Sequence, residues 1–231
     1  MPLKVLVTRP QGQAESLVTL LAEHGHDVTH EPALTIEALA PPGNSLDGLA
    51  GAHAVFFVSA NAARLALPLI AAHVGEWPPS LHCLAVGEAT AAVLRDAGLP
   101  VVVPAQGFNT EAVLQLPCLA SLEGRRIVVF RGDGGRELFA GTLRDRGAEV
   151  DYIAVYRRHC NSGFRYPPDT DVVLVTSVQS WQCMAGKISG DPVILAGSER
   201  IADAVRADHG GRVLAAPSPH DMDMLATLER L

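Results

Sequence analysis

The chain lacks the features that would assign it to nucleic acid or to a membrane. Its formal net charge is −7, so it has no basic excess for binding nucleic acid. The longest apolar region, residues 54–72, is interrupted by Ser59, Asn61, Arg64 and Pro68, which argues against a membrane span. No signal peptide is visible ahead of the first apolar run. We therefore expect a cytoplasmic protein with neither nucleic-acid nor membrane partners.

Cysteine is scarce and widely spaced. The four cysteines form no C-x-x-C pair; they are Cys83, Cys118, Cys160 and Cys183. This spacing fits a reducing compartment and predicts neither a disulfide framework nor a zinc ribbon. We expect no metal site built on cysteine.

The familiar catalytic and cofactor motifs are also missing. The chain has no Walker A sequence, no H-E-x-x-H and no G-x-S-x-G. RGDGGR (131–136) lacks the G-x-G-x-x-G spacing, so we interpret it as a strand-to-helix turn that needs glycine. His24, His26 and His30 straddle a predicted helix end, where side chains diverge, and we interpret them as surface residues. We predict no cofactor and no metal.

What the chain does have is an internal duplication. Residues 4–34 and 126–156 each read as an apolar strand, a glycine-containing turn, an amphipathic helix, a glycine stop and a second strand. Weaker similarity continues downstream, for example between AVFFVSANA (54–62) and VVLVTSVQS (172–180). The first segment aligns with the second through Val7, Arg9, Gly12, Glu15, Leu21, Gly25 and Val28, which meet Val129, Arg131, Gly134, Glu137, Leu143, Gly147 and Val150.

The alternation of strand and helix predicts an α/β fold with two similar lobes. Each lobe is expected to be a parallel sheet flanked by helices, flavodoxin-like or Rossmann-like, with a ligand cleft between the lobes. Residues 33–39 and 153–160 extend the second strand of each repeat, and we interpret them as a two-stranded linker. The expected lobes are 1–35 with 161–231, and 36–160 including the linker strands.

Polar loops follow the predicted strands. The carboxyl ends of parallel strands form the edge where α/β proteins bind ligands, and helix N-termini there favour anions. Nearby arginines strengthen this hypothesis. Ordinary helix capping is the favoured explanation of any single loop, whereas anion binding is favoured for the whole set of loops. The loops are SAN (59–61), GEAT (87–90), NTE (109–111), TSVQ (176–179), GSE (197–199) and PHD (219–221), and the arginines are Arg9, Arg64, Arg131, Arg136, Arg157 and Arg158.

Two hydroxyl residues are candidates for chemistry. Tyr156 ends an apolar strand just before Arg157 and Arg158, and a neutral phenol beside a guanidinium can donate a proton. Thr90 lies in GEATAAVL at a predicted helix start. A core tyrosine and a capping threonine are the alternatives.

An ordered set of motifs resembles the uroporphyrinogen-III synthase family over nearly the whole chain. The match is looser from TSVQSW (176–181) to the C-terminus. The motifs are LVTRP (6–10), FVSANA (57–62), AVGEATA (85–91), FNTEAVL (108–114), FRGDGGRELFAGTLRDRGAEV (130–150) and IAVYRR (153–158).

The resemblance implies a carbon–oxygen lyase of heme biosynthesis. Such enzymes cyclise the linear tetrapyrrole hydroxymethylbilane to uroporphyrinogen III, with loss of water, inversion of the last pyrrole ring and no metal or organic cofactor. The resemblance also implies two lobes with a two-stranded linker, and a substrate carrying eight carboxylates, which suits a cleft lined by arginines and helix N-termini.

The resemblance assigns roles by position. Tyr156 matches the family's linker tyrosine, proposed to assist departure of the hydroxyl, and Thr90 matches its G-x-x-T threonine. Ser198, Glu199 and Arg200 stand where many members have small hydroxyl residues. The expected catalytic residues are therefore Tyr156 and Thr90, and the expected substrate-binding residues are Arg9, Ser59, Asn61, Gly87, Thr110, Arg131, Arg136, Ser177 and Gly197.

The main alternative is a two-lobed cytoplasmic sensor or binding protein for an anionic ligand. A sensor needs export or an attached effector domain, and neither a signal peptide nor a helix-turn-helix is visible. A nucleotide-dependent enzyme is disfavoured by the glycine spacing. We expect a monomer that makes, at most, transient contact with the preceding enzyme of its pathway.

Overall fold

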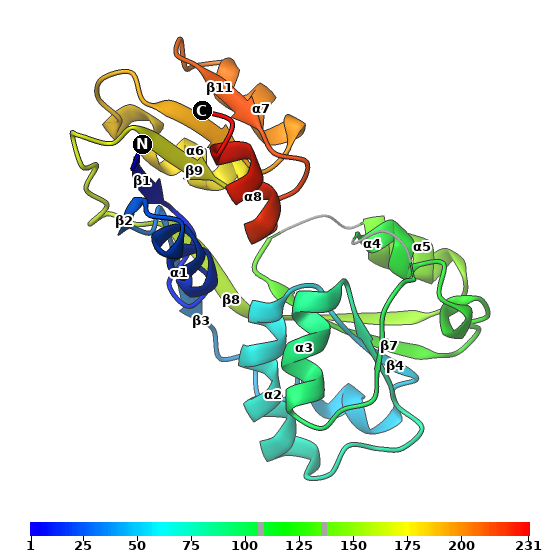
Figure 1. Ribbon diagram of the computed structural model, residues 1–231. Helices are drawn as coiled ribbons and strands as arrows, with labels where there is room; N and C mark the ends of the chain where they lie inside the picture. The colour runs from blue at the N-terminus through cyan, green and yellow to red at the C-terminus, as the bar shows by residue number, and fades with distance from the viewer. Residues whose placement is uncertain (106–108, 135–137) are drawn as a thin grey trace. The chain divides into compact units, whose positions relative to one another are not determined.

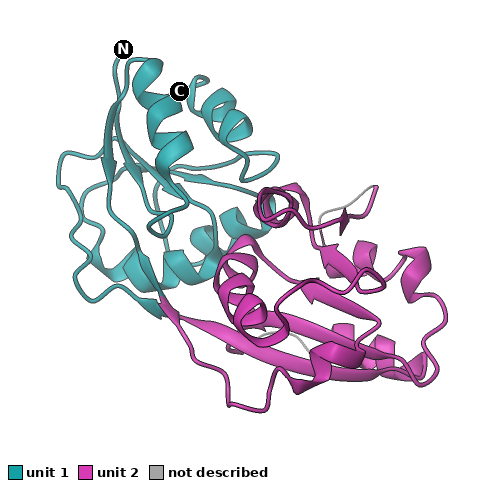
Figure 2. Cartoon of the chain, turned by 90° about the horizontal axis from the view of Figure 1, so that it is seen from below, with its two compact units in different colours: residues 1–36, 158–231 teal, residues 37–157 magenta. Residues whose placement is uncertain are grey.

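The computed structural model describes residues 1–105, 109–134 and 138–231. The chain divides into two compact units, residues 1–36 with 158–231 (unit 1) and residues 37–157 (unit 2), coloured separately in Figure 2. No helix in these described ranges has the length and apolar composition needed to cross a bilayer.

Unit 1 contains a five-stranded parallel sheet in the order β11-β10-β9-β1-β2. Most of the strands are short apolar runs, as expected where helices cover both faces, whereas the edge strand DVTH (27–30) alternates between exposed and half-buried residues. They are β1 (Lys4–Val7), β2 (Asp27–His30), β9 (Val172–Val175), β10 (Val193–Ala196) and β11 (Val213–Ala215), and the helices are α1 (Glu15–Glu23), α6 (Val178–Met184), η3 (Ala185–Lys187), α7 (Glu199–Arg206) and α8 (Asp221–Leu228).

Alternation along β1 places a separate apolar core on each face of this sheet. Val5 and Val7 pack with Leu17 of α1 and Leu225 of α8. Leu6, between the two valines, packs on the other face in the cluster that contains residues of α6 and α7. Figure 1 shows α1 and α8 lying together over one face. The unit is therefore a three-layer α/β structure.

Unit 2 is built around a second sheet in the order β3-β8-β7-β4-β5-β6. Its strands from β8 to β6 are parallel neighbours, and β3 lies at the edge. The strands are β3 (Leu34–Ala38), β4 (Ala54–Phe57), β5 (His82–Ala85), β6 (Val101–Val102), β7 (Arg126–Gly132) and β8 (Glu149–Cys160), and the helices are η1 (Asp47–Gly51), α2 (Ala60–Val74), α3 (Glu88–Asp96), α4 (Thr110–Val113), η2 (Pro117–Leu119) and α5 (Leu138–Asp145).

The second sheet is covered in the same way. Phe56 of β4 packs against Phe139 of α5, with ring centroids 4.6 Å apart. The next residue, Phe57, points to the other face and stacks on Phe130 of β7 at 5.4 Å. Helix α2 contacts both β4 and β7 on that other side.

Strands β3 and β8 carry the chain across the two unit boundaries. The N–H of Leu39 donates to the carbonyl of Val155 (2.9 Å), and the N–H of Asn161 donates to the carbonyl of Ala33 (2.9 Å). The residue numbers of one strand rise as those of the other fall, so this pair is antiparallel. The segments 33–39 and 153–160 are therefore a pair of extended strands.

The duplication is visible in the backbone. Gly25 and Gly147 both adopt positive φ (+83° and +85°) where α1 and α5 end, and Gly12 and Gly134 do so (+79° and +75°) in the preceding turns. Each repeat contributes strands to both units: β1 and β2 pair with β9–β11, whereas β7 and β8 pair with β4–β6. The predicted fold class, two α/β lobes with parallel sheets, is confirmed.

The cysteine expectation was wrong for one pair. Cys160, the last residue of β8, forms a disulfide with Cys183 of α6, across a sequence separation of 23. Their Cα atoms are 5.1 Å apart, because unit 1 brings the end of β8 against that helix. Cys83 and Cys118 are free.

Candidate functional site

Tyr156 lies in a tightly packed part of unit 2. The register between β7 and β8 shifts between Arg131 and Gly132, which places Gly132 opposite Tyr156. A β-carbon at Gly132 would lie 2.7 Å from two carbons of the phenol ring. The backbone carbonyl of Tyr156 also accepts from the N–H of Asp133 (2.7 Å). The side chain is only 2% exposed.

The hydroxyl of Tyr156 meets Ser59. The two oxygens are 3.1 Å apart, and either can be the donor. Ser59 is also the N-cap of α2, where its Oγ accepts from the N–H of Ala62 at 3.1 Å. This contact brings together one predicted catalytic residue and one predicted binding residue.

Arg131 and Arg157 hold the turn after β7. The Arg131 guanidinium donates to the carbonyl of Gly134 (2.6 Å) and lies 4.3 Å from the centroid of the Tyr152 ring. Arg157 pairs with Asp133 at 2.7 Å. The turn beside Tyr156 is therefore fixed from both strands. Arg136, a predicted binding residue, lies outside the described residues.

The remaining predicted residues of unit 2 lie at helix starts. Gly87 is the N-cap of α3 in extended backbone that any residue adopts, and Thr90 in the first turn of α3 is buried at 3% exposure. Asn61 lies in the first turn of α2, and Thr110 begins α4 directly after its cap, Asn109. The predicted placement at strand-to-helix junctions is confirmed for Asn61, Gly87 and Thr90, whereas ligand contacts at all these residues stay a prediction.

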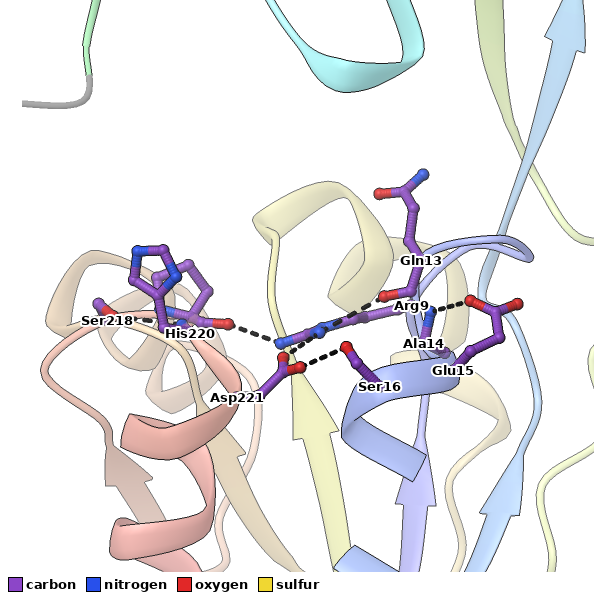
Figure 3. Close-up of polar contacts among 9 residues, drawn as sticks. Arg9, Gln13, Ala14, Glu15, Ser16, Ser218, His220 and Asp221 are labelled. Carbon is purple, nitrogen blue, oxygen red and sulfur yellow. Dashed lines mark hydrogen bonds and ion pairs between the residues drawn. The ribbon is translucent and has the colours of Figure 1, made fainter. Parts of the chain in front are cut away.

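In unit 1, Arg9 joins the first and last helical segments (Figure 3). Its guanidinium pairs with Asp221 at 2.6 Å and donates to the carbonyls of Pro219 (2.6 Å) and Gln13 (3.4 Å). The second oxygen of Asp221 accepts from the hydroxyl of Ser16 at 2.5 Å. We call Arg9, Ser16, Pro219 and Asp221 the Arg9 cluster; it links the start of α1 to the start of α8.

Three other residues of unit 1 were singled out by the sequence. Gly197 follows β10, and a β-carbon there would lie 2.8 Å from Cβ of Pro219. Gly197 and Arg9 therefore both contact Pro219, although the sequence separates them widely. Ser177 caps α6 by accepting from the N–H of Ser180 (3.0 Å), and Arg200 is exposed in the first turn of α7.

Gly132 and Asp221 were missed by the sequence reading. Gly132 lies in the noted RGDGGR stretch, but the register shift that sets it against Tyr156 leaves no local sequence signal. Asp221 is the last residue of the loop PHD (219–221). Its carboxylate could have indicated an arginine partner, which the structure shows to be Arg9.

Metal and thiol chemistry have little support among the described residues. The histidines, cysteines and acidic residues in the described part of the chain form no group of three or more that could hold a metal ion. His24 and His30 contact separate backbone carbonyls, of Leu20 and Arg9. Burial raises the pKa of the Cys83 thiol to about 12 and also raises that of Cys118, so both are poor nucleophiles near neutral pH.

Comparison with known proteins identifies relatives over most of the chain. A family model described as uroporphyrinogen-III synthase HemD matches residues 15–226. The uroporphyrinogen-III synthase of Proteus mirabilis is 33% identical over 68% of this chain and 80% of its own length. That of Escherichia coli is 32% identical over 68% of this chain and 65% of its own length.

Solved structures share the fold. A mutant uroporphyrinogen III synthase from Thermus thermophilus superposes with a TM-score of 0.65 at 17% identity, covering 99% of this chain and 98% of its own. Uroporphyrinogen-III synthetase from Helicobacter pylori gives 0.66 at 12% identity, covering 100% and 99%. With the family match spanning residues 15–226, these findings lead to one conclusion: the chain belongs to the uroporphyrinogen-III synthase family.

Proposed function

We propose that the protein converts hydroxymethylbilane to uroporphyrinogen III. The observation that carries this conclusion is the family match over residues 15–226. The carbon–oxygen bond of the hydroxymethyl group breaks, and its electron pair leaves with the oxygen, which becomes water. The lone pair of the pyrrole nitrogen stabilises the resulting azafulvene. The substituted carbon of the last ring then attacks, giving a spiro intermediate that reopens and closes with that ring inverted.

The protein's main contribution is proposed to be positional. The departing hydroxyl is already assisted by the ring nitrogen, so the demanding step is bringing two distant ends of a flexible chain into the attacking geometry. A substrate with eight carboxylates can be held at many points. The loops at the carboxyl ends of both sheets carry helix N-termini and arginines, which is the chemistry that anchors carboxylates.

Specific roles follow from this proposal. Tyr156 donates a proton to the departing hydroxyl. Thr90, which lies at the start of α3, is the second proposed catalytic residue. The proposed carboxylate contacts are Ser59, Asn61, Gly87, Thr110, Arg131 and Arg136 from unit 2, and Arg9, Ser177 and Gly197 from unit 1. Arg9 already pairs with Asp221 at 2.6 Å, so a substrate carboxylate would share its guanidinium with that acid.

The wider setting is proposed from the same function. Units 1 and 2 act as the two lobes that handle the substrate, without a metal or organic cofactor. A cytoplasmic monomer in transient contact with the enzyme that supplies hydroxymethylbilane remains our expectation. The alternative, a sensor of anionic ligands, is not favoured, since the curated relatives and the solved structures with matching folds are named as synthases.

The test is the isomer composition of the product. Without a catalyst, hydroxymethylbilane closes with no inversion to uroporphyrinogen I. Purified protein is added, the products are oxidised to porphyrins, and isomers I and III are separated by chromatography. We expect mostly isomer III, in proportion to protein concentration. Isomer I alone, formed in the presence of folded protein, would reject the proposed function.

A further inference from the structure

We infer that Ser59 is a positioning residue for Tyr156: its hydroxyl bridges the N-terminus of α2 and the phenol, and it steadies the phenolic oxygen during proton transfer. Any contact of Ser59 with a substrate carboxylate is then left to its backbone. This inference rests on the proposed function. The contact that carries it is the 3.1 Å separation of Ser59 Oγ and Tyr156 Oη inside unit 2.

The hydrogen-bonding capacity of Ser59 allows its hydroxyl to be the donor in this bond. A serine hydroxyl offers one proton and two lone pairs. The N–H of Ala62 takes one lone pair at 3.1 Å, which anchors the oxygen to the first turn of α2. The direction we assign is from the hydroxyl of Ser59 to the phenolic oxygen of Tyr156. With this direction the bond to Ser59 does not use the phenolic proton, which is the proton we assign to transfer to the substrate.

The ring itself is held against the backbone. The phenol lies so close to Gly132 that a β-carbon there would approach two ring carbons to 2.7 Å. The backbone N–H of Asp133 donates a hydrogen bond to the carbonyl of Tyr156 (2.7 Å). With the ring held by β7 and the hydroxyl held by Ser59, few degrees of freedom remain, and a fixed donor is what proton transfer to one position requires.

The duplication supplies a comparison within the chain. Ser177 occupies the matching cap position in the second repeat and accepts from the N–H of Ser180 at 3.0 Å. The other contact of its hydroxyl is with the side chain of Ser180, also 3.0 Å away. Both serines therefore cap a helix. Within the described part of the chain, Ser59 is the one of the two whose hydroxyl also bonds to a tyrosine.

The proton balance is complete without another reactant. As the carbon–oxygen bond breaks, the phenolic proton of Tyr156 passes to the departing hydroxide and water forms. The phenolate is stabilised by the hydrogen bond from Ser59. When the last ring closes at its unsubstituted carbon, that carbon loses a proton, and one proton returns to the phenolate.

A double-mutant cycle in turnover tests the role. Ser59→Ala is expected to lower kcat about fivefold with KM nearly unchanged, the size of one hydrogen bond. In a Tyr156→Phe background the same change should have less than a roughly twofold effect, because its partner is gone. Ser59→Thr keeps both bonds and should restore kcat. Equal losses in both backgrounds, or a loss confined to KM, would overturn the inference.

Two measurements separate this role from capping and from the proposed function. Ser177→Ala removes the matching cap and gives the cost of that cap in the free energy of unfolding. In protein labelled with carbon-13 at tyrosine Cζ, the resonance assigned by its loss in Tyr156→Phe should shift in Ser59→Ala and stay in Ser177→Ala. This readout needs no turnover. An unshifted resonance in folded Ser59→Ala overturns the positioning role even if isomer III is formed.

Discussion

Gly132 is the residue whose lack of a side chain allows Tyr156 to pack where it does. Its backbone does not need the left-handed region, so the requirement is for space and not for a backbone angle. The nearest atoms to an added β-carbon are two ring carbons at 2.7 Å and the hydroxyl oxygen at 3.1 Å. Because a planar ring packed on backbone cannot compress, the phenol must move if the glycine is replaced.

We predict that Gly132→Ala lowers both activity and stability. Overpacking of this kind costs about 1–3 kcal/mol in the free energy of unfolding. Displacing the phenol should also reduce kcat by roughly tenfold, as general acid catalysis depends on position. Urea unfolding and steady-state turnover measure the two effects.

Gly141 in α5 is the matched control for this substitution. An added β-carbon there meets nothing within 4 Å, and the residue lies inside a helix. Gly141→Ala is therefore expected to leave kcat unchanged and to stabilise by up to about 1 kcal/mol. Normal stability and turnover in Gly132→Ala would show that the ring is not held by this packing.

Among the contacts between helices, the Arg9 cluster links the beginning of α1 to the beginning of α8. Its ion pair is largely buried, with 12% of the Arg9 side chain and 26% of the Asp221 side chain exposed. The carboxylate also accepts from Ser16 at 2.5 Å, and the guanidinium donates to Pro219. Two segments from opposite ends of the chain are held by these bonds.

We predict that Asp221→Asn destabilises the protein by about 1–3 kcal/mol, because it leaves a mostly buried guanidinium without its counter-charge. Chemical denaturation measures the change. The comparison is Glu199→Gln, which removes an exposed ion pair with Arg206 and should lower the stability much less, because solvent screens exposed charges. Equal effects of the two substitutions would contradict a stabilising role for the Arg9 cluster.

The elements themselves were largely predictable from the sequence. Short apolar runs marked the strands, and glycines at matching repeat positions marked helix ends, because both signals are local. The disulfide between Cys160 and Cys183, the Ser59–Tyr156 bond and the pairing of Arg9 with Asp221 were not predicted. Each contact depends on which distant segments the fold brings together. The spacing of residues along the chain does not predict these long-range contacts.

The sequence duplication and the pairing of strands divide the chain in different ways. The sequence repeats run consecutively, yet each sheet combines strands from both repeats. Neither repeat can therefore complete a sheet with its own strands in the pairing observed. The two crossings of the chain, at residues 36–37 and 157–158, follow directly from this exchange. Tyr156 lies next to one of these crossings.

We expect the protein to act mainly by folding its substrate into position, with Tyr156 only assisting departure of the hydroxyl. The most direct test is the turnover and product isomer of Tyr156→Phe. We predict a decrease in kcat of roughly tenfold to a hundredfold, at or below the lower end for general acid catalysis, because the pyrrole nitrogen also drives departure. The product should remain isomer III. Loss of activity to the uncatalysed level in a folded variant, or a product shifted to isomer I, would rule out this assisting role of Tyr156.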